Sequence, residues 1–153
     1  MAVQLQGNLV KKAHKKIKYT DKMLADLAKC SDPETGPMYF MENFLQIQHP
    51  TKGAIKFEPF NFQKNLVKNY HENRFSINML PRQTGKTTCA SAYLLWYAMF
   101  VPDSQILIAA HKYTGAQDIM NRFRYAYESV PDFIRPGIYS YNRNTIEFDN
   151  GSR

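Results

Sequence analysis

Apolar residues recur at helical spacing in the first third of the chain. Over residues 20–30 the spacing predicts an amphipathic helix, with Thr20 placed to accept a hydrogen bond at its N-terminus. A broad apolar face over residues 38–48 predicts a second helix, which His49-Pro50 ends. After Gly53, a short run of alternating character predicts an extended segment. These residues therefore form a helical lead to the rest of the chain.

From residue 61 onward, helical patterns alternate with short apolar runs. Helices are predicted over residues 61–73, 85–100 and 113–130. Strands are predicted over residues 74–80, 105–110 and 144–151. The run at 105–110 is continuously apolar, which is typical of a strand buried on both faces, and the last strand ends in Asn-Gly, a hairpin-turn signal. This order predicts an α/β fold with parallel central strands.

Composition limits the classes of protein to consider. The chain has 153 residues, 44% hydrophobic and 14% aromatic, which is sufficient for one domain with its own core and argues against intrinsic disorder. Two cysteines, Cys30 and Cys89, give no disulfide framework. No apolar run approaches the roughly 18 residues that span a membrane, and no signal peptide is readable. The sequence therefore predicts a globular domain for a reducing compartment.

Positive charge is concentrated at the N-terminus. Six lysines against one aspartate in residues 1–22 account for +5 of the net charge of +7. Such an arm can attract phosphate backbones, but a solvated, flexible terminus is the favoured interpretation. We therefore divide the chain into a basic, flexible arm (1–18), a helical lead segment (19–52) and the alternating helix-and-strand section (53–153).

Candidate chemistry lies where the strand predicted at 74–80 meets the helix predicted at 85–100. Gly85-Lys86-Thr87 is the GK[ST] end of a phosphate-binding P-loop. Glycine lets backbone approach a phosphate, the helix start directs N–H groups and its positive dipole end at the anion, lysine neutralises phosphate charge, and the Thr87 hydroxyl can ligate Mg²⁺. The full motif has glycine five residues before Gly85, where this chain has Leu80.

Two further side chains have chemistry that suits a nucleotide. Arg82, inside the loop, can contact phosphate oxygens bidentately and act as an arginine finger in cis, or it can form a surface salt bridge. Gln63 lies on the helix before the loop, and its amide offers both a donor and an acceptor, as the edge of adenine requires.

The segments FNFQKNLV, MLPRQTGKTTCASAYLLWYAMF and ILIAAHKYTGAQDIMNRFRYAYESVPDFIRPGI occur in this order, and with NTIEFDNGSR they cover residues 57–153. Together they resemble the N-terminal portion of the large terminase subunit of tailed bacteriophages. The resemblance implies an incomplete P-loop NTPase-type three-layer α/β/α sheet, preceded by a helical segment, with ATP and Mg²⁺ as cofactors. It implies that Lys86 and Arg82 are catalytic, that Thr87 binds the metal and that Gln63 contacts adenine. The implied cofactor-binding residues are Gln63, Arg82, Gln83, Thr84, Gly85, Lys86, Thr87 and Thr88.

The resemblance also implies a role and partners. The expected function is ATP-driven translocation of double-stranded viral DNA into a capsid, in a homo-oligomeric ring with the portal protein and the small terminase subunit as partners. The expected place is the host cytoplasm during virion assembly, transiently at the procapsid portal, with no membrane association and no secretion.

Hydrolysis in this family needs a Walker B aspartate and an adjacent glutamate after a buried strand. None of the 13 acidic residues fits that pattern, and no nuclease domain is present. We therefore expect a part of a larger ATPase, truncated before Walker B, which alone binds nucleotide weakly and does not hydrolyse it. The alternatives are a fragment of a helicase or restriction-type DNA translocase, and a nucleotide-binding or interaction module without hydrolysis.

Overall fold

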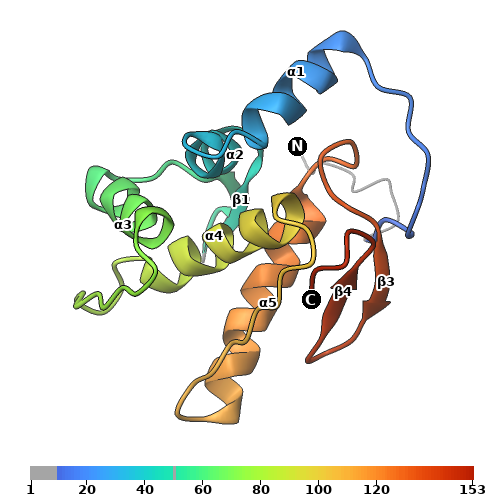
Figure 1. The fold of residues 1–153 in the computed structure, drawn as a ribbon. Helices are drawn as coiled ribbons and strands as arrows, with labels where there is room; N and C mark the ends of the chain where they lie inside the picture. The colour runs from blue at the N-terminus through green and yellow to red at the C-terminus, as the bar shows by residue number, and fades with distance from the viewer. Residues whose placement is uncertain (1–9, 50) are drawn as a thin grey trace.

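The computed structural model describes residues 10–49 and 51–153, so the first half of the predicted arm and Pro50 lie outside the described residues. The chain is built around one central helix, α4 (Lys86–Phe100), against which the other helices pack (Figure 1). Helices α1 (Asp21–Cys30) and α2 (Gly36–Phe44) lie above it, and α3 (Asn61–Glu72) lies beside its first half. Helix α5 (Tyr113–Ser129) crosses α4 below.

The helix predictions are largely confirmed. Helix α1 begins after Thr20, whose hydroxyl accepts a hydrogen bond from the Met23 N–H at 3.4 Å, as the capping prediction requires. Helices α3, α4 and α5 follow the three later helical patterns to within a residue or two. The helix predicted over 38–48 is wrong in its second half, because α2 ends at Phe44 and Leu45 adopts an extended backbone with its side chain buried.

Two antiparallel hairpins replace the predicted parallel sheet in the described part of the chain. Strand β1 (Gln46–His49) pairs with β2 (Gly53–Lys56), which places Ile47 opposite Ile55 and agrees with the extended segment predicted after Gly53. Strand β3 (Ile138–Tyr141), which the sequence reasoning missed, pairs with β4 (Ile146–Phe148). The Asn-Gly turn after β4 is confirmed, since Gly151 has φ +84° and the Phe148 N–H donates to the Ser152 carbonyl.

The strands predicted at 74–80 and 105–110 are not formed among the described residues. Their apolar side chains are mostly exposed, with Ile77 at 96%, Met79 at 94% and Leu107 at 92%. An apolar run becomes a strand only where another backbone pairs with it. Among the described residues only Arg153 does so, bonding to Ser104 and Ile106. A mixed helix-and-strand architecture is therefore confirmed, whereas burial of these two runs is wrong for this part of the chain.

The core is centred on α4 and its contacts with α1 and α2. Leu95 is fully buried and Trp96 is 3% exposed. The Trp96 indole N–H donates to the Cys30 carbonyl at 2.8 Å, which ties α4 to the end of α1. Gly36 allows this approach, because a Cβ at that position would lie 2.4 Å from the Cys30 carbonyl oxygen. Both sides of α4 are therefore used for packing, as its strongly apolar sequence predicts.

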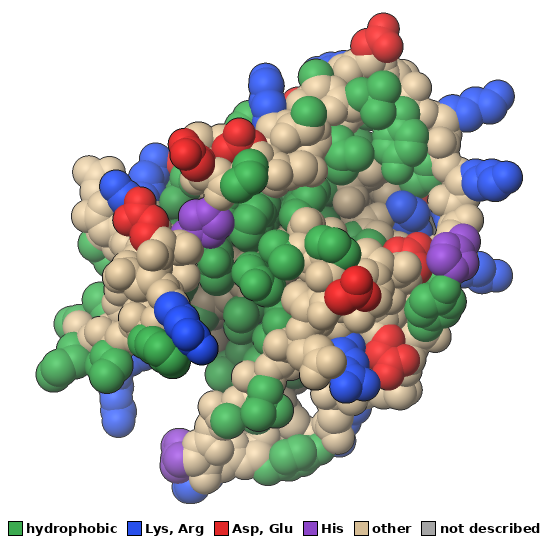
Figure 2. Space-filling model, viewed as in Figure 1, with side chains coloured by type: hydrophobic (Ala, Val, Ile, Leu, Met, Phe, Trp, Pro, Cys, Tyr) green, Lys and Arg blue, Asp and Glu red, His purple; other side chains and the backbone are tan. Residues whose placement is uncertain are grey.

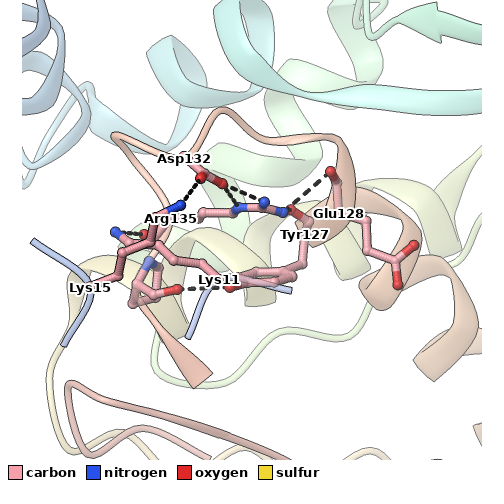
Figure 3. Close-up of polar contacts among 7 residues, drawn as sticks. Lys11, Lys15, Tyr127, Glu128, Asp132 and Arg135 are labelled. Carbon is pink, nitrogen blue, oxygen red and sulfur yellow. Dashed lines mark hydrogen bonds and ion pairs between the residues drawn. The ribbon is translucent and has the colours of Figure 1, made fainter. Parts of the chain in front are cut away.

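Residues 10–15 lie against the end of α5 and the start of β3, rather than free in solvent as predicted for the arm (Figure 3). The buried Lys11 ammonium donates to the Arg135 carbonyl at 2.7 Å, and the Lys11 carbonyl accepts from the Ile138 N–H. Lys15 forms an ion pair with Asp132, which also binds the buried guanidinium of Arg135. Two of the arm's six lysines are therefore committed to internal contacts, while Lys12, Lys16 and Lys18 stay exposed.

Asp132 predicts a contribution to stability that depends on pH. Partial burial alone would raise the pKa of this carboxyl group, but hydrogen bonds from Lys15 and Arg135, with their charges, lower it below its ordinary value. A carboxyl group with a depressed folded pKa stabilises the fold above its unfolded pKa of about 3.9, and this contribution is lost as the pH falls through the folded value. Because the Asp132 side chain is 40% exposed, we expect no more than about 1 kcal/mol.

The test is urea unfolding of Asp132→Asn between pH 2 and pH 7. The variant is expected to lose stability at pH 7 and to show a shallower decline below pH 4 than the parent chain. Asp118→Asn is the matched control, because Asp118 is exposed and forms no ion pair within the described residues. Equal acid limbs for Asp132→Asn and the parent would refute a depressed pKa at Asp132.

Candidate nucleotide-binding site

The predicted loop connects residues 74–80 to α4 through two residues with left-handed backbone. Gln83 has φ +65° and Gly85, the N-cap of α4, has φ +75°. Alternation of left- and right-handed residues curves a backbone into a concave nest of N–H groups, which suits an anion. A non-glycine residue with positive φ is uncommon and is concentrated at functional sites. The local backbone therefore has the form that binding of phosphate requires.

The lysine of the loop is turned back over this concavity. Lys86 donates from its ammonium group to the Leu80 carbonyl at 3.3 Å, and the Thr84 hydroxyl donates to the Pro81 carbonyl at 3.0 Å. These bonds close the loop using backbone oxygens, so Leu80 fills the glycine position of the full motif without a clash of its side chain with the lysine. Lys86 forms no ion pair with any described carboxylate, so its charge is available to a phosphate.

Gln63 reaches the loop from the first turn of α3. Its side chain is 6% exposed, its Oε1 accepts from the Phe60 N–H at 3.0 Å, and its Nε2 donates to the Thr84 carbonyl at 3.0 Å. A Cβ at Gly85 would lie 2.7 Å from Nε2. Gln63 therefore fastens α3 to the loop. Sequence reasoning missed this contact, because nothing in the local pattern marks a partner 21 residues away.

The remaining predicted residues divide by exposure. Arg82 and Gln83 are exposed, and Thr87 and Thr88 are half-buried in the first turn of α4. Arg82 makes no salt bridge with any described residue, so the surface-pair alternative has no support in the described part of the chain. Cys89 follows directly and is fully buried, and burial raises the pKa of its thiol to about 11. The structure thus brings all the predicted site residues to one loop and the side chain beneath it.

Two cavities lie beside this loop and its helix. One, of about 510 Å³, is bounded by β1, the first half of α4 and the middle of α5. The other, of about 690 Å³ and mainly apolar, lies between residues 105–108, α5 and β4, away from the loop. Hydrophobic side chains gather on the face over α4, between α3 and α5 (Figure 2). The smaller cavity is the one that reaches the loop, through Thr88.

Other types of site were sought in the same part of the chain. Within residues 10–49 and 51–153, no group of three or more His, Cys, Asp or Glu side chains is arranged to hold a metal ion. In those ranges no helix combines the length and apolar character needed to cross a bilayer. The loop with its neighbouring cavity is therefore the candidate site that we develop.

Fold and site together describe a mixed helix-and-strand protein with a phosphate-loop type of turn at the start of its central helix. Residues 77–153 match the sequence model of a family described as terminase large subunit, T4likevirus-type, N-terminal. The match takes in the loop, α4, α5 and the β3–β4 hairpin, 77 of the 153 residues. The chain therefore belongs to the terminase large subunit family, which confirms the resemblance. In general, these proteins are ATPase motors of phage DNA packaging that work with DNA, a portal protein and a small terminase subunit.

Proposed function

We propose that residues 82–88 bind the triphosphate of ATP in a packaging motor that translocates double-stranded viral DNA into a capsid. The observation that carries this proposal is the loop itself, with left-handed backbone at Gln83 and Gly85 and the Lys86 ammonium folded over it. Backbone N–H groups and the positive end of the 15-residue α4 attract the phosphates, and Lys86 neutralises them. The family match favours this motor over a helicase or restriction-type translocase.

Thr87 is the residue proposed to hold Mg²⁺. Its hydroxyl is in the first turn of α4, half-buried, next to the proposed phosphate position. Mg²⁺ commonly takes one or two protein oxygens and completes its octahedron with water and substrate phosphates, so a single hydroxyl fits this donor set. When bound, the ion neutralises charge on the phosphate oxygens.

Arg82 is proposed to contact the γ-phosphate. It is exposed within the loop and makes no ion pair within the described residues, so its guanidinium is available for bidentate contact with phosphate oxygens. We further propose that segments 74–80 and 105–110, whose apolar side chains are exposed, are strands of the three-layer P-loop sheet that the resemblance implies. The proposed setting is the host cytoplasm, in a ring of subunits at the procapsid portal.

Lys86→Ala tests the proposed binding of ATP. Loss of one charge-assisted contact costs about 1.5–3 kcal/mol, so we expect MgATP to bind roughly 10- to 150-fold more weakly, as measured by titration calorimetry or with a fluorescent ATP analogue. Lys22→Ala on α1 is the control, because it removes the same charge from an exposed site remote from the loop in sequence. Equal affinity of Lys86→Ala and the parent chain would refute the proposal, whereas equal weakening by both variants would indicate a nonspecific charge effect.

A further inference from the structure

The cavity of about 510 Å³ between β1, α4 and α5 has the size and lining of a small-molecule site. It contains a buried polar group without a partner. Ser91 is 2% exposed and lines the cavity, and no described group hydrogen-bonds its hydroxyl. Buried polar groups are nearly always hydrogen-bonded, so this hydroxyl favours a polar occupant of the cavity.

The other lining residues indicate the chemistry of that occupant. Asp118 and Arg122 contribute one charge of each sign and form no ion pair within the described residues, so the lining has no excess of cations for a phosphate chain. Gln48 and Asn121 supply amides that both donate and accept, and Tyr125 supplies an aromatic ring.

The rest of the lining includes aliphatic side chains, Leu45, Ile47 and Ala92. Amides that read donors and acceptors, an aromatic ring and an apolar wall together suit a flat, uncharged heterocycle that bears polar edges. The carboxylate of Asp118 suits the hydroxyls of a sugar.

Position connects this cavity to the loop. Thr88 belongs to the first turn of α4 and lines the cavity, and Ser91 follows three residues later, about 4.5 Å further along the helix axis. The cavity therefore begins where the proposed phosphate site ends. By contrast, the Gln63 amide is already bonded to Thr84 and Phe60, so it has to release the loop before it can read a base.

We infer that this cavity takes the nucleoside of the bound nucleotide, with the base against Asn121 and Tyr125 and the sugar toward Asp118. The inference rests on the proposed function, since it assumes that the phosphates lie at the loop. It assigns nucleotide selectivity to α5 and β1 rather than to the start of α3.

The test compares MgATP with magnesium tripolyphosphate, which has the phosphates without the nucleoside. The parent chain is expected to bind MgATP at least tenfold more tightly than tripolyphosphate. The double variant D118A/N121A, at two exposed positions of α5, is expected to lower MgATP affinity to the tripolyphosphate level and to leave tripolyphosphate binding unchanged. Thr114→Ala, exposed on the same helix and outside both cavities, is the control that changes neither affinity.

Each other outcome has a defined meaning. If the parent binds neither ligand, the proposed function fails, and the inference fails with it. If the parent binds both ligands equally, or the double variant keeps the preference for MgATP, the nucleoside is not in this cavity while the loop proposal stands. Photolabelling with 8-azido-ATP gives an independent readout: label in residues 113–135 is expected, and label confined to residues 57–64 would place the base beside Gln63 instead.

Discussion

Replacing Trp96 with alanine is expected to lower the free energy of unfolding by about 3–5 kcal/mol, the largest effect on stability that we predict for one substitution. Trp96 is 3% exposed in the centre of α4, with the rings of His71, Tyr93 and Phe100 at centroid distances of 5.5, 6.0 and 6.1 Å. Its removal leaves a cavity where α1, α3 and α4 meet, and it leaves the Cys30 carbonyl without its indole donor. Since small domains have a net stability of about 5–15 kcal/mol, this loss is a large share.

Two control variants separate the parts of this effect. Trp96→Phe keeps much of the ring but removes the N–H, so it is expected to cost less than Trp96→Ala while still leaving the buried Cys30 carbonyl unsatisfied. Tyr97→Ala changes the next residue, which is 37% exposed, and is expected to cost under about 1 kcal/mol. Urea unfolding is followed by far-UV circular dichroism, because Trp96 is the only tryptophan. A loss below about 1 kcal/mol for Trp96→Ala would show that α4 is not packed against α1 as described.

The helices were predictable because their signals are local. In α1, α3 and α5 the apolar spacing within the segment itself fixes both the type of element and the face that is buried. Strands depend on a partner that may be distant in sequence, which explains the errors. Residues 74–80 and 105–110 have strand-like composition but no strand beside them in the described chain. Conversely, Gln46–His49 continued an apolar pattern and was taken as helix, although pairing with β2 makes it a strand.

The site divides in the same way. Gly85, Lys86 and Thr87 could be predicted because a phosphate loop is a contiguous motif at the start of a helix. The bond from Gln63 to the Thr84 carbonyl and the cavity beside Ser91 could not be predicted, since each depends on how separate elements pack. Gln63 was singled out for its amide chemistry, and the contact that the structure gives it is with the loop backbone. The adenine contact implied by the resemblance stays a prediction, which the photolabelling experiment tests.

Replacing Gly85 with alanine is expected to destabilise the loop for two separable reasons and to weaken MgATP binding at least tenfold. The first reason is the backbone, since φ of +75° costs a residue with a Cβ about 1–2 kcal/mol. The second is steric, because the new Cβ would lie 2.7 Å from Gln63 Nε2, and Gln63 is buried and hydrogen-bonded through both of its amide atoms. Displacement of Gln63 breaks its bond to Thr84 and releases the loop from α3.

Gly53 offers a matched control for the backbone part of this effect. It has φ of +72°, and a Cβ there would have no atom within 4 Å, so Gly53→Ala measures the backbone cost alone. We expect Gly85→Ala to lower the free energy of unfolding by about 1 kcal/mol more than Gly53→Ala does. In a Gln63→Ala background this excess is expected to vanish, because the clashing amide is gone, although the loop stays weak for MgATP without its support from α3. If the excess persists in that background, Gln63 is not the group that requires glycine at position 85, and its proposed role in holding the loop fails.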